Sequence, residues 1–299
     1  MYPRLFLKAT ALIIALLVVI GLTAGVLSGL LGIGGGTLFT PVLFYLFNSQ
    51  GIPNPELWTI GTSLFCTFAA SSGGTIKHIQ QHSAFIREGF TVGAFGVIGT
   101  ALGKYVATST WFTAQEFLLV IGIVFLYTGI NFIRKGLNRK GAPSGEDHAD
   151  SDITPGKATT IGGAGGFVAA LSGLGGGVLM VPIMNLIYKF TLRKSVSVSE
   201  TAIVSISLAG WLQYILRSPL VDLDSSQLLD GNLFATVSPY SMGYIDFGVA
   251  LPLVIGAFIG SGFGVKMHDK INTRIIKIIF GVLLLLVAAR MAVEFANGG

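Results

Sequence analysis

The sequence predicts an all-α polytopic membrane protein made of two homologous halves, each with a glycine-interrupted helix pair and about three transmembrane helices. Three observations support this fold class. Only 11% of the 299 residues are charged, against about 25% in soluble domains, and the mean hydropathy is +0.75. The apolar runs are continuous, as in helical spans, rather than alternating, as in barrel strands. One glycine motif also occurs twice.

The polar residues indicate which partners to expect. The formal net charge is +5, but the 19 Lys and Arg residues lie at the ends of apolar runs, which is typical of membrane orientation. The single cysteine, Cys66, excludes an intramolecular disulfide. The glycine motif lacks the GK[ST] ending of a phosphate loop. We therefore expect a lipid bilayer and a small anionic substrate as partners, with no nucleic acid and no cofactor; the oligomeric state is left open.

The first half, residues 1–133, begins with an apolar segment at residues 5–27. Residues 1–24 resemble a signal peptide, with Arg4 and Lys8 ahead of an apolar stretch. The run is longer than a signal peptide requires and leads directly into the glycine motif, so we predict a retained helix. After the motif, apolar segments are predicted at residues 38–47, 58–76, 90–106 and 117–133.

A polar stretch of mixed charges, glycine and proline follows at residues 134–158, and we predict a flexible cytoplasmic linker there. The second half, residues 159–299, repeats the pattern. Its apolar segments are predicted at residues 159–171, 200–216, 247–265 and 275–292, and an apolar run also follows the second glycine motif as far as residue 188. Residues 217–246 are mostly polar.

The two glycine motifs are copies of one another. The first, GIGGGTLFTP, begins at Gly32, and the second, GLGGGVLMVP, begins at Gly173, 141 residues later. Six of the ten positions are identical. Weaker matches follow: GTSLF at residue 61 with ETAIV at residue 200, and GVIGTALGKY at residue 96 with AFIGSGFGVK at residue 257. Matching interruptions in the two halves of a membrane protein indicate a transport site.

The Lys and Arg positions favour inverted halves. If each interrupted element crossed the membrane once, the basic residues would be spread almost evenly over the two sides. If each element is a re-entrant hairpin, the linker and most basic residues lie on the cytoplasmic side. The segment at residues 159–171 is also too short to span, which takes about 20 residues. The segment at residues 5–27 could span alone, and this alternative stays open.

The interrupted helices carry the predicted substrate site. Non-helical backbone at membrane depth occurs only where it is buried in protein or lines a cavity. Glycine lets a ligand approach the main chain, and the N–H groups at the start of a helix suit an anion. The candidate substrate-binding residues in the motifs are Gly34, Gly35, Gly36, Thr37, Gly175, Gly176 and Gly177. Pro41 and Pro182 lie beyond the first helical turn, so we expect kinks there.

Helix packing is the competing interpretation of glycine in membrane helices. We adopt it for Gly99, Gly103, Gly256, Gly260 and Gly264, whereas the duplicated motifs favour ligand binding. Hydroxyl groups in the following spans could donate to an anion without carrying charge, or could bond back to their own helix. These hydroxyl residues are Thr62, Ser63, Thr67, Thr201, Ser205 and Ser207.

Charged residues are sparse within the spans. Lys77, His78 and Arg217 lie at span ends, where they could attract anions to the entrances or simply anchor the interface. Glu200 is the carboxylate that could face a cavity and couple transport to a cation. The HIQQH stretch at residues 78–82 has two histidines at i and i+4, but it lacks the glutamate of the hydrolytic zinc motif, and we predict no metal site.

The paired G-x-GGG-x₄-P motifs, the polar central loop and the Thr62–Ser63 pair resemble the TauE/SafE sulfite exporter family, also called the toluene sulfonate uptake permease family. The resemblance extends from about Gly21 to Ala292. It implies a carrier for sulfur-containing anions or organic acids, rather than an enzyme, in the bacterial cytoplasmic (inner) membrane. It also implies that the glycine motifs, Thr62, Ser63 and Thr201 form the substrate site, although Ala202 stands where a second serine is expected.

Energetics favour export. An anion that leaves a cell with a negative interior moves downhill by about 2.3 kcal/mol per charge per 100 mV. Because the carboxylates lie at span ends, we expect passive or weakly coupled export of sulfite, sulfonate or sulfoacetate-type anions. The alternatives are an anion channel and a proton-coupled uptake permease for sulfonates or organic acids. An enzyme would need an acid–base pair or metal ligands within the spans.

Overall fold

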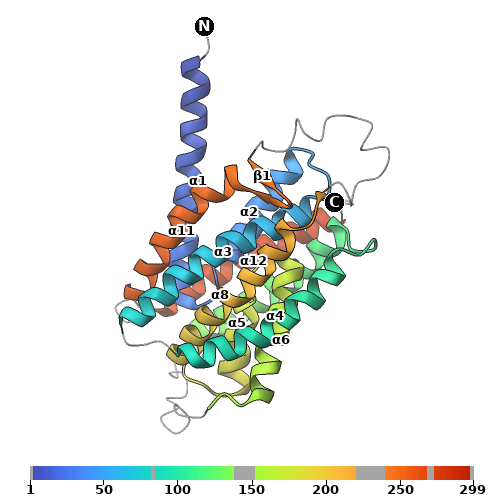
Figure 1. The fold of residues 1–299 in the computed structure, drawn as a ribbon. Coiled ribbons are helices and arrows are strands. Elements are labelled where there is room, and N and C mark those ends of the chain that lie inside the picture. Colours follow the sequence, from blue (N-terminus) through green and yellow to red (C-terminus); the bar gives the residue numbers. More distant parts are fainter. Residues whose placement is uncertain (1–2, 82–84, 138–151, 220–239, 268–272, 297–299) are drawn as a thin grey trace.

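The computed structural model describes residues 3–81, 85–137, 152–219, 240–267 and 273–296. These residues are almost entirely helical, with one antiparallel sheet of two short strands (Figure 1). The elements in chain order are α1 (Pro3–Leu31), α2 (Gly36–Ser49), α3 (Pro55–Gln80), α4 (Ile86–Ala107), α5 (Ala114–Leu137), α6 (Pro155–Ser172), α7 (Gly177–Pro182), η1 (Ile183–Ile187), α8 (Leu192–Ile215), β1 (Ser241–Met242), β2 (Ile245–Asp246), α11 (Phe247–Met267) and α12 (Thr273–Ala296).

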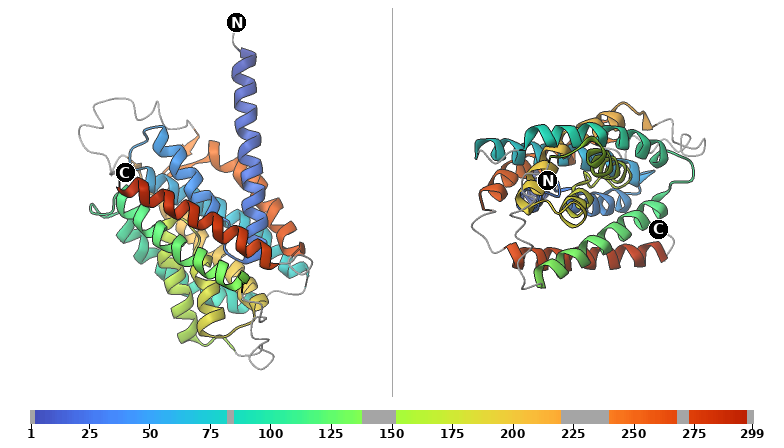
Figure 2. Two further views of the ribbon diagram at one scale, coloured as in Figure 1. Left: turned by 180° about the vertical axis from the view of Figure 1, so that it is seen from behind. Right: turned by 90° about the horizontal axis from the view of Figure 1, so that it is seen from below.

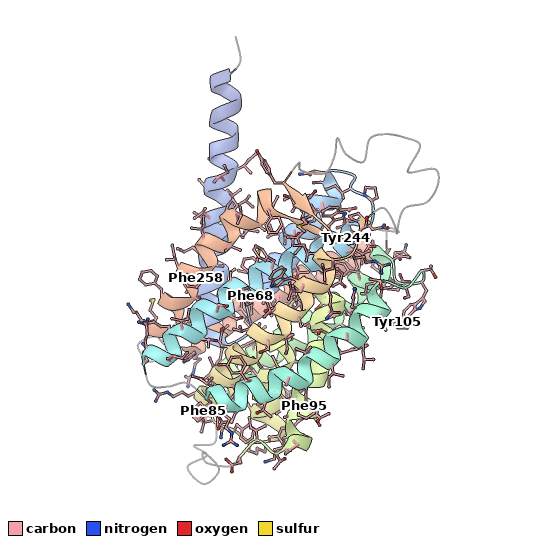
Figure 3. The ribbon with its side chains drawn as sticks, viewed as in Figure 1. Phe68, Phe85, Phe95, Tyr105, Tyr244 and Phe258 are labelled. Atoms are coloured by element: carbon pink, nitrogen blue, oxygen red, sulfur yellow. The ribbon has the colours of Figure 1, made fainter. Side chains whose placement is uncertain are left out.

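Six helices in the described residues are long and apolar enough to cross a membrane. They are Leu12–Leu31 within α1, the whole of α4, α5, α8 and α11, and Arg274–Ala296 within α12. Many large apolar side chains on these helices are exposed; Tyr105 and Phe258, for example, lie on the outside of the bundle (Figure 3). Such a surface suits contact with lipid, and the prediction of a helical, multi-pass membrane protein is confirmed.

Helix α3 differs from the other predicted spans. It contains the segment predicted at residues 58–76, but it is not among the six apolar helices, since hydroxyl and glycine residues lower its hydropathy. Most of its side chains are buried, and it packs against α2, α8 and α11. A helix surrounded by protein can be polar at membrane depth because its neighbours, rather than lipid, meet its side chains.

Each glycine motif ends one helix and starts the next. Helix α1 ends at Leu31 and α2 begins at Gly36; α6 ends at Ser172 and α7 begins at Gly177. From the first break, α2 turns back toward the end of the molecule where α1 starts, whereas α6 and α7 lie toward the opposite end (Figures 1 and 2). The glycine-interrupted helix pairs are therefore confirmed, while the inversion of the halves across the membrane stays a prediction.

The two prolines affect their helices differently. Pro41 lies inside α2, which continues through it as an α-helix. Pro182 is the last residue of α7 and is followed by the π-helical turn η1. A proline ring removes one backbone donor and crowds the preceding turn, and a π-turn is one way in which a helix accommodates such a disruption.

Glycines form the contacts between α1 and α11 and between α4 and α6. A Cβ added to Gly260 would lie 2.2 Å from the Leu22 carbonyl oxygen, and one added to Gly99 would lie 2.3 Å from the Gly163 carbonyl oxygen. Backbone carbonyls are equally close to Gly103, Gly256 and Gly264. Helix backbones approach this closely only where side chains are missing, so the packing interpretation of these five glycines is confirmed.

Gly260→Ala is expected to destabilise the protein, whereas Gly262→Ala in the same helix is not. A methyl group at position 260 meets the backbone of α1 and costs about 1–3 kcal/mol of strain. A methyl group at position 262 meets nothing within 4 Å, and alanine is the better helix former. Thermal unfolding in detergent measures the difference. Equal melting temperatures for the two variants would contradict the packing role of Gly260.

The polar connections differ from their predicted bounds. Helix α5 continues to Leu137 and α6 begins at Pro155, so the predicted linker is shortened at both ends, and residues 138–151 lie outside the described residues. The polar segment at residues 217–246 ends in the β1–β2 pair, in which Ser241 is opposite Asp246. Residues 220–239 of this segment also lie outside the described residues. The division into two repeats stays a prediction.

Candidate functional site

The two glycine motifs adopt the same backbone conformation. Their φ angles are positive, between 64° and 84°, at Gly32, Gly34, Gly35, Gly173, Gly175 and Gly176. Residues with a Cβ rarely adopt this conformation, whereas glycine does so without steric cost. The third glycine of each triplet, Gly36 or Gly177, begins the next helix. The positive φ angles therefore explain why both motifs are rich in glycine.

The two breaks touch each other inside the protein. A Cβ added to Gly36 would lie 2.7 Å from the Gly173 carbonyl oxygen, and one added to Gly177 would lie 2.7 Å from the Gly32 carbonyl oxygen. All residues at positions 32–37 and 173–178 are buried. The structure thus brings together the residues that were predicted in the two motifs.

The breaks leave main-chain donors unused. In the part of the chain that the structure describes, the amides of Gly34, Gly35, Gly175 and Gly176 donate to no backbone carbonyl. Buried amides in proteins are nearly always paired, and each unpaired one costs about 1–3 kcal/mol. Successive free amides of this kind form concave sites that attract anions.

Hydroxyl groups from each half of the sequence donate hydrogen bonds to the glycine break of the other half. Ser63 of α3 donates to the Gly173 carbonyl oxygen at 2.8 Å, and Ser199 of α8 donates to the Gly32 carbonyl oxygen at 2.8 Å. Thr40 of α2 also reaches across, donating to the carbonyl oxygen of Ser172 at 3.0 Å. Each break is therefore held by a hydroxyl group from the other half of the sequence.

These bonds relate residues that the sequence match between the two halves does not pair. The match of residues 61–65 with residues 200–204 pairs Ser63 with Ala202, at a separation of 139. In the structure Ser63 and Ser199 make equivalent bonds at a separation of 136, and Thr67 and Ile203, also 136 apart, both contact Gly34. Ser63 therefore shares its hydrogen-bonding role with Ser199, because a match over a few apolar residues does not determine which helix face is turned inward.

Two buried hydroxyl groups next to the breaks make no hydrogen bond within the described residues. Thr37, which follows Gly36, is 1% exposed, and Thr67 is fully buried. A Cβ added to Gly34 would lie 3.2 Å from Thr67 Cγ2, which places Thr67 beside the first break. Buried polar atoms are normally paired, so these two hydroxyls are available to hydrogen-bond a ligand or water beside the break.

Thr62 and Thr201 do not face the breaks. The Thr62 hydroxyl accepts a hydrogen bond from the Asp246 amide at 3.2 Å. The Thr201 hydroxyl donates to the Ser197 carbonyl oxygen at 3.0 Å, within its own helix, and its side chain lies against Gly89 of α4. Consecutive residues of a helix point about 100° apart, so a helix that turns Ser63 inward turns Thr62 away.

Ser63→Ala and Ser199→Ala are expected to lower the stability of the protein by similar amounts. Each substitution removes the donor to one break carbonyl, at a cost of about 1 kcal/mol. Ser49→Ala is the matched control, because its exposed hydroxyl donates to Leu46 in its own helix. Thermal unfolding in detergent checks this. If only one of these two variants lost thermal stability, the conclusion that both serines stabilise the glycine breaks would be contradicted.

Glu200 lies beside the first break. It is fully buried, and its Oε1 accepts a hydrogen bond from the Ser28 hydroxyl at 2.9 Å. Gly74 of α3 leaves space for the carboxyl group, since a Cβ there would lie 2.9 Å from Glu200 Oε2. The Ser28 carbonyl in turn accepts from the Gly32 amide at 2.7 Å. Ser28 therefore links the Glu200 carboxyl group to the first break through two hydrogen bonds.

Sequence reasoning missed Ser28 and Ser199. Each is a serine in a membrane helix without a motif around it, and such residues most often bond to their own helix. The signal that could have found Ser199 is its four-residue spacing from Ser195, which places the two serines on one face of α8.

The residues predicted at the entrances lie at helix ends, away from the breaks. Lys77 donates to Gln80 Oε1 at 2.7 Å in the last turn of α3, and His78 beside it is 5% exposed. Arg217 follows the end of α8. Their role in attracting anions stays a prediction. His82, the second histidine of HIQQH, lies outside the described residues.

The chain is similar to known proteins over most of its length. Residues 17–291 match the family described as sulfite exporter TauE/SafE. A probable membrane transporter protein of Methanocaldococcus jannaschii is 25% identical over 273 residues, which cover 91% of this chain and 93% of the relative. YunE, a probable membrane transporter protein of Bacillus subtilis, is 27% identical over 293 residues, covering 93% and 97%. No solved structure matches the chain. Because the family match spans both halves and both glycine breaks, the chain belongs to the TauE/SafE family of membrane transporters.

Proposed function

We propose that this protein exports small sulfur-containing anions, of the sulfite, sulfonate or sulfoacetate type, and binds them between the two glycine breaks. The proposal rests on hydrogen-bond donors that have no acceptor among the described residues. These are the glycine amides of both breaks and the hydroxyls of Thr37 and Thr67. Sulfite and sulfonate groups are compact oxyanions whose oxygens accept hydrogen bonds from several amides at once.

The neutral character of these donors suits a transporter. A permeating ion must bind strongly enough to enter and weakly enough to leave. Amide and hydroxyl donors satisfy an oxyanion without the strong attraction of a buried lysine or arginine. The membrane potential then drives the anion out of a cell with a negative interior.

The proposal includes two homologous halves that are inverted in the membrane. It is supported by the equal backbone conformations of the breaks and by the reciprocal bonds of Ser63 and Ser199. In transporters built from inverted repeats, the substrate lies near the bilayer midplane, where the halves meet. The close contact between the two breaks supports the same position for the substrate in this protein.

Flux measurements on purified protein in liposomes test the proposal. Vesicles loaded with sulfite, a sulfonate or sulfoacetate should release the anion faster when an imposed potential pulls it outward. The rate should saturate with substrate concentration, whereas a channel would give a linear rise. Protein-free liposomes are the control. The absence of flux for all three anion types would overturn the proposal.

Glu200 favours proton-coupled transport as a second candidate function. Its fully buried carboxyl group accepts a hydrogen bond from the Ser28 hydroxyl, and no lysine, arginine or histidine of the described residues forms an ion pair with it. An ionised carboxylate without a partner is costly to bury, so the neutral form suits this place. Uptake that requires an imposed pH difference across the same liposomes would favour this candidate over passive export.

A further inference from the structure

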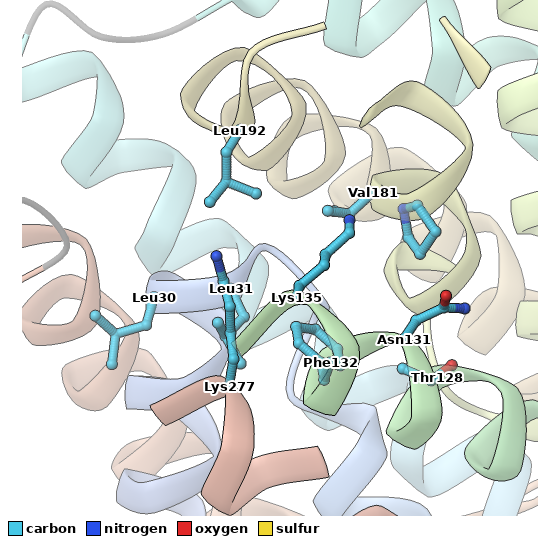
Figure 4. A pocket seen from close by; sticks show the side chains of 10 residues that line it. Leu30, Leu31, Thr128, Asn131, Phe132, Lys135, Val181, Leu192 and Lys277 are labelled. Carbon is cyan, nitrogen blue, oxygen red and sulfur yellow. The ribbon is translucent and has the colours of Figure 1, made fainter. Parts of the chain in front are cut away.

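A cavity separate from the glycine breaks contains two lysine side chains (Figure 4). It is partly open to the outside. Its apolar walls include Leu30, Phe132, Val181 and Leu192, and Thr128 and Asn131 add polar groups. The cavity therefore combines a mainly apolar lining with two cationic groups.

The two lysines come from different helices. Lys135 belongs to α5 and Lys277 to α12; both are partly buried, and their ammonium groups point into the same space (Figure 4). Lys135 Nζ donates to Asn185 Oδ1 at 3.0 Å. No aspartate or glutamate is among the described residues that line the cavity, and Lys277 acts on Lys135 as a like charge. Like charges in apolar surroundings are unfavourable unless an anion lies between them.

We propose that this cavity binds an amphipathic oxyanion, with its acidic head between Lys135 and Lys277 and its apolar body against Leu30 and Leu192. Both lysines lie near helix ends, Lys135 in the last turn of α5 and Lys277 near the start of α12. The ends of membrane helices lie near the bilayer surface, so the ligand has two sources with the same acidic head: an organic sulfonate in solution and an anionic phospholipid. The proposal does not depend on transport through the breaks.

Thermal unfolding of the full-length protein in neutral detergent tests this site. One arm titrates hexanesulfonate, with hexanol as the uncharged control; the other titrates phosphatidylglycerol, with phosphatidylcholine as the zwitterionic control. The test variant is Lys135→Gln/Lys277→Gln, whose amides keep a similar length and the ability to donate to Asn185. The charge-matched control is Lys189→Gln/Lys266→Gln, since both of these lysines are exposed.

A ligand that binds the folded state raises the melting temperature. We expect at least one of the two anions to do so in the wild type and in the control variant. In the test variant, the concentration needed should rise about tenfold or more, since charge-assisted hydrogen bonds are lost. The arm that responds identifies the source of the ligand. The single variant Lys277→Gln should be intermediate, which keeps the test decisive if the double variant unfolds.

Two results would overturn the proposal. One is that neither hexanesulfonate nor phosphatidylglycerol stabilises the wild type beyond its uncharged or zwitterionic control. The other is that the lysine variants are stabilised as much as the wild type. Neither result bears on flux through the glycine breaks, so failure of this site and failure of the transport proposal are distinguishable.

Discussion

Gly34→Ala is expected to reduce anion flux by about tenfold or more while the protein stays folded. The added methyl group would lie 3.0 Å from Ile203 Cδ1 and 3.2 Å from Thr67 Cγ2. Both atoms are side-chain ends that can shift by a few tenths of an ångström. The methyl group would nevertheless occupy space beside the unused amides of the first break, where we propose that the substrate accepts its hydrogen bonds.

Gly51→Ala is the matched control for this variant. Gly51 has a similar positive φ, 66° against 84° at Gly34, but a Cβ there would meet nothing within 4 Å. Both variants should therefore lose a similar stability from backbone strain, about 1–2 kcal/mol. Liposome flux and melting temperature are measured on the same preparations. If Gly51→Ala lost flux to the same degree, strain rather than crowding at the break would be the cause, and the binding role would be refuted.

Glu200→Gln is expected to abolish the pH dependence of transport. Glutamine has nearly the same shape as glutamate, and its Oε1 can still accept from Ser28, but it cannot ionise. In the wild type, an ionised Glu200 beside the break would repel the substrate anion. Transport should therefore be fast at low pH, where the carboxyl group is neutral, and should fall as the pH rises and the proton is lost. The glutamine variant should stay fast throughout.

The measurement uses an alkanesulfonate, because its charge is constant over the pH range, and compares flux at equal pH on both sides of the liposome. Glu88→Gln in the first turn of α4 is the control for the loss of one carboxylate and should keep the wild-type profile. His78, one turn beyond Gly74 on the same face of α3, is another titratable group. A pH dependence that survives Glu200→Gln but disappears in His78→Gln would assign the titration to the histidine.

Much of the helical framework could be predicted from apolar runs. Helices α4, α5, α11 and α12 lie where continuous hydrophobic segments occur, because transfer of side chains into lipid is a local property of the sequence. Their ends were predicted less well. Helix α5, for instance, continues past Arg134 and Lys135, since backbone hydrogen bonding does not require apolar side chains.

The sequence predicted the glycine residues of the candidate site but not all of the hydroxyl groups beside them, and this difference has a physical cause. Gly34 and Gly175 could be located because a positive φ strongly favours glycine wherever it occurs. The hydroxyls of Thr62 and Thr201 make their hydrogen bonds to Asp246 and Ser197, because the rotation of a helix about its axis is set by everything packed around it; their role in binding stays a prediction. A short apolar sequence match does not record that rotation, so it did not indicate that Ser199 donates to the first break.

The sequence by itself determined that this chain lies in a membrane and that two of its helices are interrupted by glycine. Both follow from local properties: the hydrophobicity of each segment and the backbone conformations that each residue permits. Only the tertiary structure decided that the breaks touch, that Ser28 holds Glu200, and that Lys135 and Lys277 share a cavity. These arrangements join residues far apart in the chain, and packing between helices, rather than any local pattern, selects which side chains meet.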